Sequence, residues 1–313
     1  MEFFSTTAAE NAARDYRHLR VRPLTGALGA EVTGVDLRAL DDETFTELHT
    51  AALDHGVLCI RGQALGVSEL EAFTKRWGPF GDDPFVGGLP EHPHVVRVVK
   101  EADEKHPLVF GGAWHSDWSF QRTPPAWTLL YGHDVPEYGG DTLFANAALA
   151  WEWLSPTLRE LLAPLVAQHS PERAYGAAAR HNALVEHMDI RYGEAAHLVG
   201  EHPLVRVHPD TGRPALFVNP GYTTGIRGMR AEEAELLLGH LFRVITNPAF
   251  QCRLRWEPGT LTLWDNRWVL HNPVADYHGV RRELFRTTVA GEVPRGLRDA
   301  PAPAADAVAS ASG

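Results

Sequence analysis

The stretch T-L-T-L-W-D-N-R-W-V-L-H-N-P, residues 260–273, joins two apolar runs through a polar corner at Trp264-Asp265-Asn266. The first run is rich in β-forming residues and is typical of a buried strand, and the second carries His271. Similar runs bounded by Gly, Pro, Asn or Asp predict strands at 57–61, 95–99, 126–131, 204–208, 215–218 and 284–290. The chain is therefore predicted to be mainly β.

Helical patterns interrupt these strands at a few places. Acidic first-turn residues and helical spacing predict a helix over 41–55, with Gly56 as its stop. Ser68 and Glu71 form a capping-box pattern that predicts a helix ending near Gly78. Two more are expected, one from Ser155-Pro156 to about residue 166 and one over 231–246. Scattered strands with a few helices favour a sandwich or barrel with flanking helices over βαβ repeats.

The composition is that of an ordinary globular protein. Of the 313 residues 44 % are apolar and 22 % charged, and a net charge of −11 argues against nucleic acid as the main partner. Cys59 and Cys252 form no Cys-x-x-Cys pair, so no disulfide framework is predicted and a reducing cytoplasm fits. No export signal or membrane span is expected. Residues 299–313 lack periodicity and are predicted to be a disordered tail.

Among 17 histidines, three stand in His-x-Asp triplets, so the triplet alone is a weak signal. Residues 115–117 differ by their context, because Trp114, Trp118 and Phe120 surround them and an apolar strand follows. A ligand pair spaced by two must project from one face of a strand into a cavity, which this context favours. The triplet at 187–189 lies in a polar stretch, and the one at 208–210 is typical of a β-turn.

A third ligand would complete a facial triad of two imidazoles and one carboxylate, which suits Fe(II) that activates oxygen. His271 is the candidate, and the alternative for it is a hydrogen-bonded core histidine. Downstream, Arg282 and Arg286 share one face of the predicted strand. Arg282 suits the distal carboxylate of a dicarboxylate cosubstrate, since a guanidinium binds carboxylate bidentately. The alternative to a binding role is that these arginines lie at a solvent-exposed strand edge. That alternative is favoured for Arg281, and both readings remain open for Arg286.

These residues lie within six motifs that resemble the taurine dioxygenase/2,4-D dioxygenase (TauD/TfdA) family of Fe(II)/2-oxoglutarate enzymes. The motifs are W-H-S-D-W-S-F (114–120), T-P-P-A (123–126), G-G-D-T-L-F (139–144), A-L-F-V-N-P-G-Y-T-T (215–224), W-D-N-R-W-V-L-H (264–271) and R-R-E-L-F-R-T-T (281–288). The likeness runs from about residue 20 to 295. It implies a double-stranded β-helix, or cupin-like jelly roll, in a single domain spanning 1–298.

The resemblance also implies cofactors and residue roles. The cofactors are Fe(II), 2-oxoglutarate and O₂. The iron ligands would be His115, Asp117 and His271. Arg282 would bind the distal carboxylate of 2-oxoglutarate with help from Thr142, and Arg286 would lie near both the substrate anion and the metal-bound end of the cosubstrate. For the substrate pocket, with core aromatics as the alternative, the expected walls are Trp118, Tyr222 and Phe85.

The loop at 80–95 departs from the taurine enzyme, because Val86 and Leu89 stand where that enzyme has a His and a Tyr for its substrate. A larger or aromatic substrate than taurine is therefore expected. Asp117 is retained, whereas halogenating relatives replace this carboxylate, so hydroxylation, desaturation or cyclisation is the expected outcome.

Three hypotheses follow for the protein's role. The first is a catabolic dioxygenase that hydroxylates beside a sulfonate, sulfate ester or aryloxy group and releases it. The second is a biosynthetic tailoring enzyme for an amino-acid-derived or other secondary-metabolite intermediate. The third is a metal-free binding jelly roll. The expected partners are a small-molecule substrate and further copies of the chain in a dimer or tetramer.

Overall fold

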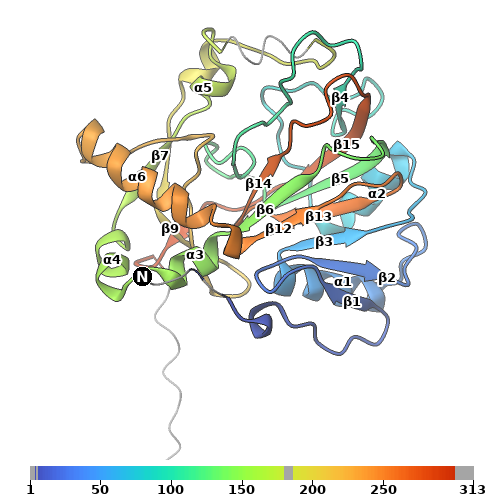
Figure 1. The fold of residues 1–313 in the computed structure, drawn as a ribbon, viewed down its shortest axis with the longest axis horizontal. Coiled ribbons are helices and arrows are strands. Elements are labelled where there is room, and N and C mark those ends of the chain that lie inside the picture. Colours follow the sequence, from blue (N-terminus) through green and yellow to red (C-terminus); the bar gives the residue numbers. More distant parts are fainter. Residues whose placement is uncertain (1–3, 5, 180–185, 300–313) are drawn as a thin grey trace, which may run out of the picture.

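The computed structural model describes residues 4, 6–179 and 186–299 (Figure 1). Its largest sheet has seven strands, in which β2 and β3 pair in parallel and the other neighbours are antiparallel. In sheet order the strands are β1 (Arg20–Pro23), β2 (Ala30–Thr33), β3 (Val57–Ile60), β13 (Leu261–Asp265), β5 (Trp127–Asp134), β15 (Arg282–Val289) and β4 (Val96–Lys100).

A three-stranded sheet packs with this large sheet around a shared apolar core. The chain passes from one sheet to the other at the Trp264-Asp265-Asn266 corner, and the ring of Phe144 lies 5.4 Å from that of Trp264 across the core. The three strands in order are β12 (Gln251–Leu254), β6 (Thr142–Asn146) and β14 (Val269–Pro273). This pair of packed sheets is the mainly β core predicted from the sequence.

Two smaller sheets extend the core. One contains β11 (Thr223–Ile226), β7 (Val166–His169) and β8 (Gly200–Pro203). The other contains β10 (Pro214–Leu216), β9 (Val205–Val207) and β16 (Arg295–Gly296). Short 3₁₀ helices cover Ala8–Asn11, Glu194–His197 and Pro248–Phe250.

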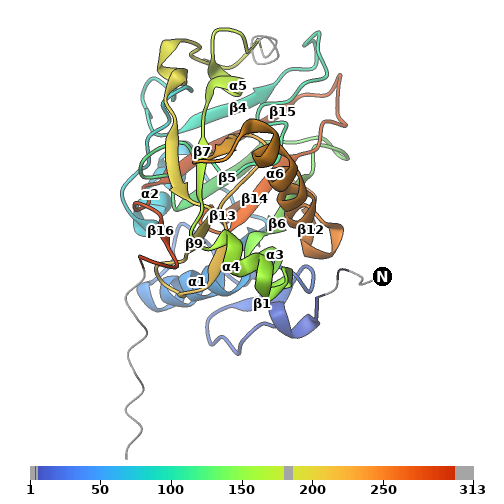
Figure 2. The same ribbon diagram turned by 90° about the vertical axis from the view of Figure 1, so that its left-hand side faces the viewer.

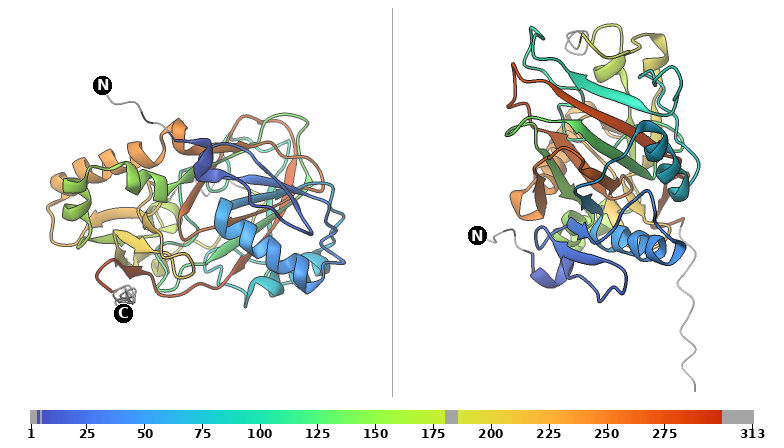
Figure 3. Two further views of the ribbon diagram at one scale, coloured as in Figure 1. Left: turned by 90° about the horizontal axis from the view of Figure 1, so that it is seen from below. Right: turned by 90° about the vertical axis from the view of Figure 1, so that its right-hand side faces the viewer.

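Among the described residues, six α-helices flank the sheets: α1 (Asp42–His55), α2 (Val67–Trp77), α3 (Ala147–Trp153), α4 (Pro156–Leu162), α5 (Glu172–Tyr175) and α6 (Ala231–Ile245). Helices α1 and α2 pack on the large sheet, whereas α6 lies with α3 and β11 toward the opposite end of the molecule (Figures 1 and 3). In the described part of the chain no helix has the length and apolarity needed to cross a bilayer.

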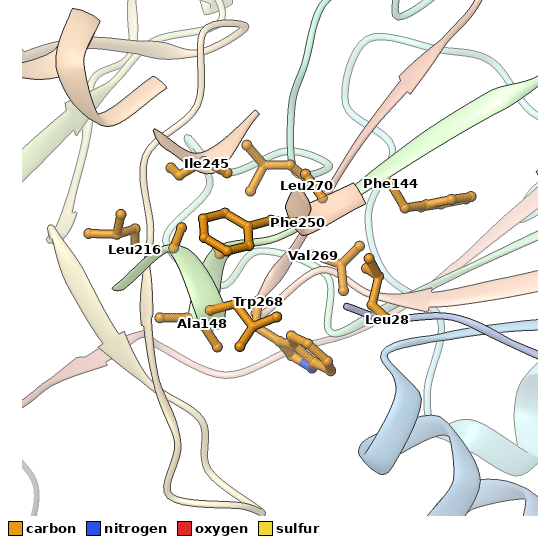
Figure 4. Packing of buried hydrophobic residues seen from close by; sticks show 14 of the residues in the cluster. Leu28, Phe144, Ala148, Leu216, Ile245, Phe250, Trp268, Val269 and Leu270 are labelled. Atoms are coloured by element: carbon orange, nitrogen blue, oxygen red, sulfur yellow. The ribbon is translucent and has the colours of Figure 1, made fainter. Parts of the chain in front are cut away.

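The largest apolar cluster includes residues of α6 and of the sheet formed by β12, β6 and β14. In Figure 4 the ring of Phe250 lies among Leu216, Ile245 and Leu270, which come from β10, α6 and β14. Leu270 precedes His271 on β14, so this cluster fixes one wall of the region where the predicted ligands lie.

Most predicted elements are present, with two corrections. Helix α1 ends at the expected Gly56, with φ 71°, and begins at Asp42 with Asp41 as its N-cap. Helix α2 lacks the predicted capping box. It begins at Val67 with Gly66 as its N-cap, so Ser68 lies inside the first turn and cannot cap the helix. Helix α4 stops at Leu162 instead of about residue 166, since Pro164 lacks the N–H that a further turn requires. The predicted tail lies, except for Asp299, outside the described residues.

The corner between the two large sheets is held by a buried ionic network. Asp265 accepts hydrogen bonds from Arg267 Nε and Nη2, both at 2.7 Å, and from His208 Nε2 at 2.9 Å. His208 Nδ1 in turn accepts from the backbone N–H groups of Asp210 and Thr211. The 208–210 triplet is thus part of a turn, as predicted, and its histidine supports the corner.

We expect Asp265→Asn to destabilise the fold by about 3 kcal/mol, because removing one charge from a buried pair leaves the other uncompensated. The matched control is Asp36→Asn, which breaks an exposed pair with Arg38 and should leave stability unchanged. Urea unfolding followed by circular dichroism measures both. Equal midpoints for Asp265→Asn and the unmodified protein would contradict a supporting role for this network.

Candidate active site

His115, Asp117 and His271 lie together, buried, at the end of the sandwich near α5. His115 and His271 form an antiparallel bridge in which each backbone N–H donates to the other's carbonyl, at 3.0 and 2.8 Å. His115 Nε2 lies 3.5 Å from Asp117 Oδ1, and one potential ligand atom from each residue lies within 4.8 Å of the others. The chain thereby brings residues more than 150 positions apart into one cluster.

The ring of His115 is oriented by a backbone carbonyl. Its Nδ1 lies 2.6 Å from the carbonyl oxygen of Ala113, and because a carbonyl only accepts, Nδ1 carries the proton. Gly111 packs so closely that a Cβ there would lie 3.1 Å from the ring. Nε2 is therefore left with its lone pair toward the cluster, as in metal-binding histidines whose other nitrogen donates to a carbonyl.

The carboxylate of Asp117 is oriented by the sheet corner. Thr128 Oγ1 donates to Asp117 Oδ2 at 2.6 Å, and the Asp117 backbone N–H donates to Asn266 Oδ1 at 3.2 Å. Asn266 Nδ2 donates to Thr128 Oγ1, while Trp264 Nε1 donates to Asn266 Oδ1. This network leaves Oδ1 of Asp117 facing His115. The sequence showed a corner here but gave no sign that Asn266 aligns the carboxylate.

The protonation states of the cluster suit a divalent cation. Burial would raise the pKa of Asp117, but its interactions with His271 and with the cationic Arg286 outweigh that effect and hold the pKa well below its usual range. Burial, and then repulsion from His115, lowers the pKa of His271 to about 3. A carboxylate and neutral imidazoles are the donor set of non-haem iron sites, and the residues present fit that group.

Arg282 lies buried in a pocket apart from the three-residue cluster. Its guanidinium lies over the rings of Trp256 and Tyr277, and its Nε and Nη2 have no hydrogen-bond partner among the described residues. Trp256 Nε1 donates to Thr142 Oγ1 at 3.0 Å, so Thr142 borders the same pocket. Buried guanidinium groups without partners are costly, and a carboxylate would satisfy this one. Arg281 instead points outward and pairs with Glu101, Asp134 and Glu283.

Arg286 is already paired. Its Nη2 contacts Asp83 of the 80–95 loop, and its Nη1 lies 3.6 Å from Asp117 Oδ1. The guanidinium lies between the rings of Phe110 and Trp118, and Trp118 Nε1 also donates to Asp83, at 2.8 Å. Trp118 adopts a left-handed φ of 45°, a strained conformation for a non-glycine residue that follows directly on Asp117.

A cavity of about 280 Å³ adjoins the cluster. His115, Tyr175, Tyr222 and Arg173 line it, together with apolar residues of the loop after β4. That loop and α5 lie at the same end of the molecule in Figures 1 and 2. Of the residues expected to bind substrate, only Tyr222 lines this cavity, and sequence analysis had not singled out Tyr175 or Arg173.

The other expected pocket residues lie behind the cavity wall. The ring of Phe85 stacks on Tyr175 at 4.7 Å, and Trp118 packs against Tyr175 at 5.5 Å between ring centres. The 187–189 triplet lies apart from the cluster, with His187 exposed and its Nε2 3.8 Å from Asp103. Among the described residues, His115, Asp117 and His271 form the one group of His, Cys, Asp or Glu side chains that lie close enough together to hold a metal ion. Neither of the other two His-x-Asp triplets contributes to such a group.

Comparison with known proteins places these features in a family. The model of the taurine catabolism dioxygenase TauD, TfdA family matches residues 20–288. An alkylsulfatase of Acinetobacter baylyi is 33 % identical over 93 % of this chain and 90 % of its own length. An alpha-ketoglutarate-dependent sulfate ester dioxygenase of Pseudomonas putida is 32 % identical over 93 % of this chain and 96 % of its own.

A crystal structure of a taurine dioxygenase from Burkholderia xenovorans superposes with a TM-score of 0.76 at 34 % identity, covering 91 % of this chain and 95 % of that one. The jelly-roll fold expected from the motifs is thereby confirmed. The chain belongs to the TauD/TfdA family and is an Fe(II)- and 2-oxoglutarate-dependent dioxygenase.

Proposed function

We propose that His115, Asp117 and His271 bind the iron and that Arg282, with Thr142, binds the distal carboxylate of 2-oxoglutarate. The observation that carries this assignment is a three-donor cluster beside a cavity, together with a buried guanidinium that has two unpaired nitrogens. When bound, Fe(II) with 2-oxoglutarate and O₂ supplies the oxidation of an unactivated C–H bond, with succinate and CO₂ as co-products. Arg286, 3.6 Å from Asp117, keeps that carboxylate ionised.

The protein's own residues position and shield this chemistry. Ala113 and Thr128 fix the orientations of His115 and Asp117, and all three donors are buried, which limits their contact with bulk solvent. Trp256 and Tyr277 enclose Arg282 in a low-dielectric setting where its attraction for a carboxylate is stronger than in water. Asp117 supports hydroxylation as the outcome, as expected from the family.

We further propose that the substrate is a small organic anion of sulfate ester, sulfonate or aryloxyalkanoate type. Two relatives at 32–33 % identity are named as an alkylsulfatase and a sulfate ester dioxygenase. The cavity of about 280 Å³ is just below the usual size of ligand sites, roughly 300–1,000 Å³, which suits a small substrate. Its walls are mainly apolar, which suits the hydrocarbon part of such a molecule.

One observation favours a second candidate, a tailoring oxygenase for a neutral or amino-acid-derived intermediate. Arg286, the residue expected near the substrate anion, is neutralised by Asp83 and lies outside the lining of the cavity. A neutral substrate would need no free cation there.

The iron ligands are tested by His115→Ala against His187→Ala, its counterpart in the exposed triplet. We expect His115→Ala to weaken Fe(II) binding at least ~100-fold, because even loss of an outer partner of a ligand costs 10–100-fold. His187→Ala should bind Fe(II) normally. Anaerobic equilibrium dialysis measures both affinities, and circular dichroism checks that both variants fold. Normal Fe(II) affinity in folded His115→Ala would rule out this ligand set.

The cosubstrate site is tested by Arg282→Ala, with its neighbour Arg281→Ala as the matched control. Loss of charge-assisted hydrogen bonds worth about 3 kcal/mol should raise the Kd for 2-oxoglutarate roughly 100-fold. Arg281→Ala should change it less than about twofold, since that side chain pairs with surface carboxylates. Anaerobic titration of the weak visible absorption of the Fe(II)–2-oxoglutarate chelate gives Kd. Equal effects of the two substitutions would argue against Arg282 as the anchor.

The substrate class is tested by succinate formation with matched anionic and neutral probes. We expect alkyl sulfates, alkanesulfonates or phenoxyalkanoates to stimulate succinate formation well above the substrate-free rate, and 1-hexanol and other neutral analogues not to do so. Stimulation by neutral probes alone would favour the tailoring enzyme. No stimulation by either set, with no chelate absorption, would favour a binding protein without activity.

A further inference from the structure

The loop after β4 separates two parts of the candidate site. Leu108 and Val109 line the cavity that adjoins the metal cluster, and they also line the pocket that contains Arg282. Phe110, the next residue along the chain, borders the same pocket. Residues 108–110 therefore form a partition, with the proposed cosubstrate pocket on one side and the cavity proposed for the substrate on the other.

The backbone of this loop has few attachments to the rest of the protein. Among the described residues, the backbone of 102–112 forms only local hydrogen bonds apart from those to one side chain, Lys100. Beyond the partition the chain enters the bridge between His115 and His271. The partition is thus held from both ends, by Lys100 on one side and by the ligand bridge on the other.

Lys100 is buried and its donors are fully used. Its side chain is 5 % exposed, and its Nζ donates to Glu104 Oε2 at 3.2 Å and to the carbonyls of His106 and Leu108. An ammonium has three N–H donors, so none remains for a ligand. Lys100 lies opposite Arg282 in the pairing of β4 with β15 and borders the same pocket. Of these two cations, Arg282 keeps free donors among the described residues.

Glu104 neutralises this lysine inside the protein. Its side chain is 1 % exposed, and its Oε1 has no hydrogen-bond partner among the described residues. Glutamate and lysine are rarely buried this deeply unless they are paired, and such a pair is often no more stabilising than apolar side chains of the same volume. A buried pair in this loop therefore points to a requirement for a fixed position of the chain.

We propose that Lys100 and Glu104 are positioning residues that hold the partition at 108–110 in place for both pockets. This rests on the proposed function, because it takes Arg282 as the anchor of 2-oxoglutarate. A wall that is already ordered spares each ligand the free-energy cost of ordering it on binding. Loosening the partition should therefore weaken the binding of cosubstrate and substrate together, whereas a change inside one pocket should weaken only one of them.

The test variant is the double substitution Lys100→Met/Glu104→Gln. Lys100→Met alone would leave Glu104 as an uncompensated buried charge, whereas the double variant removes both charges and nearly keeps the side-chain volumes. The matched control is Lys105→Met, in the same loop, where the lysine side chain is 77 % exposed. Lys100→Arg keeps the charge and has enough N–H donors for the same three acceptors, so it is the conservative variant. Circular dichroism checks that all three variants fold.

The first readout is the Kd for 2-oxoglutarate, from anaerobic titration of the absorption of the Fe(II)–2-oxoglutarate chelate. We expect the double variant to raise this Kd at least about tenfold, Lys100→Arg to raise it less, and Lys105→Met to match the unmodified protein. The Kd for hexyl sulfate, from the change it causes in the same absorption at saturating 2-oxoglutarate, should also rise in the double variant. Arg282→Ala should raise the first Kd and leave the second unchanged.

The second readout is amide hydrogen exchange of peptides from 101–113, which requires no activity. In the unmodified protein with Fe(II), 2-oxoglutarate should slow exchange in 106–112. Without ligands, the double variant should exchange faster there than the unmodified protein, while β5 and β15 should be unchanged. An unchanged Kd for 2-oxoglutarate in the folded double variant would overturn the proposal, even if the variant were less stable, because the pair would then serve stability alone.

Failure of the proposed function gives a different pattern of results. If Arg282→Ala leaves the Kd for 2-oxoglutarate unchanged, the cosubstrate site lies elsewhere and both proposals are wrong. If Arg282→Ala weakens binding and the double variant does not, only the role of Lys100 and Glu104 is overturned. If hexyl sulfate does not bind to the unmodified protein, that result argues against the proposed substrate class, and the cosubstrate and exchange readouts decide the role of the pair.

Discussion

The two backbone hydrogen bonds between His115 and His271 are the constraint on which the site depends. They join the segment that precedes β5 to β14, and so close the sandwich at the end where the candidate ligands lie. With the backbones fixed, Ala113 orients His115 and Thr128 orients Asp117, whereas Nδ1 of His271 has no hydrogen-bond partner among the described residues. The same bridge sets the position of Trp118, whose left-handed backbone is tolerated because Asp83 holds its indole.

The buried arginines of the core differ in how many of their nitrogens have a partner, and Arg206, paired with Glu292, also keeps two unpaired among the described residues. Arg267 and Arg286 have carboxylate partners, whereas Arg282 keeps two nitrogens unpaired inside an aromatic enclosure. An unsatisfied buried donor costs roughly 1–3 kcal/mol, so such a site lowers stability until its anion binds. This is the expected compromise at a functional site, and the supporting network around Asp265 offsets it nearby.

The sequence predicts what depends on local pattern and misses what depends on distant contacts. Strong periodicity identified α1, α6, β13 and β15, whereas β6, β7 and β12 are four or five residues long and carry no clear alternation. The spacing of 282 and 286 predicted two arginines on one face, and both are buried. The sequence could not predict the different environments of these two arginines, because Asp83, the partner of Arg286, lies about 200 positions away in the chain. For the same reason Asn266 and Arg173 gave no signal.

The strands and the loops contribute different parts of the candidate site. The candidate ligands and Arg282 lie on or beside paired strands, while the cavity is walled by the loop after β4, by α5 and by the segment before β11. The loop after β4 is held by Lys100, whose buried ammonium donates to the carbonyls of His106 and Leu108 at 2.6 and 2.9 Å. Some of these loop residues also support the candidate ligands, because Ala113 orients His115 and Gly111 and Gly221 pack against it. Wall residues without such contacts can change more freely. Asp83 of the 80–95 loop pairs with Arg286, and neither residue lines the cavity, whereas Arg173 of α5 does.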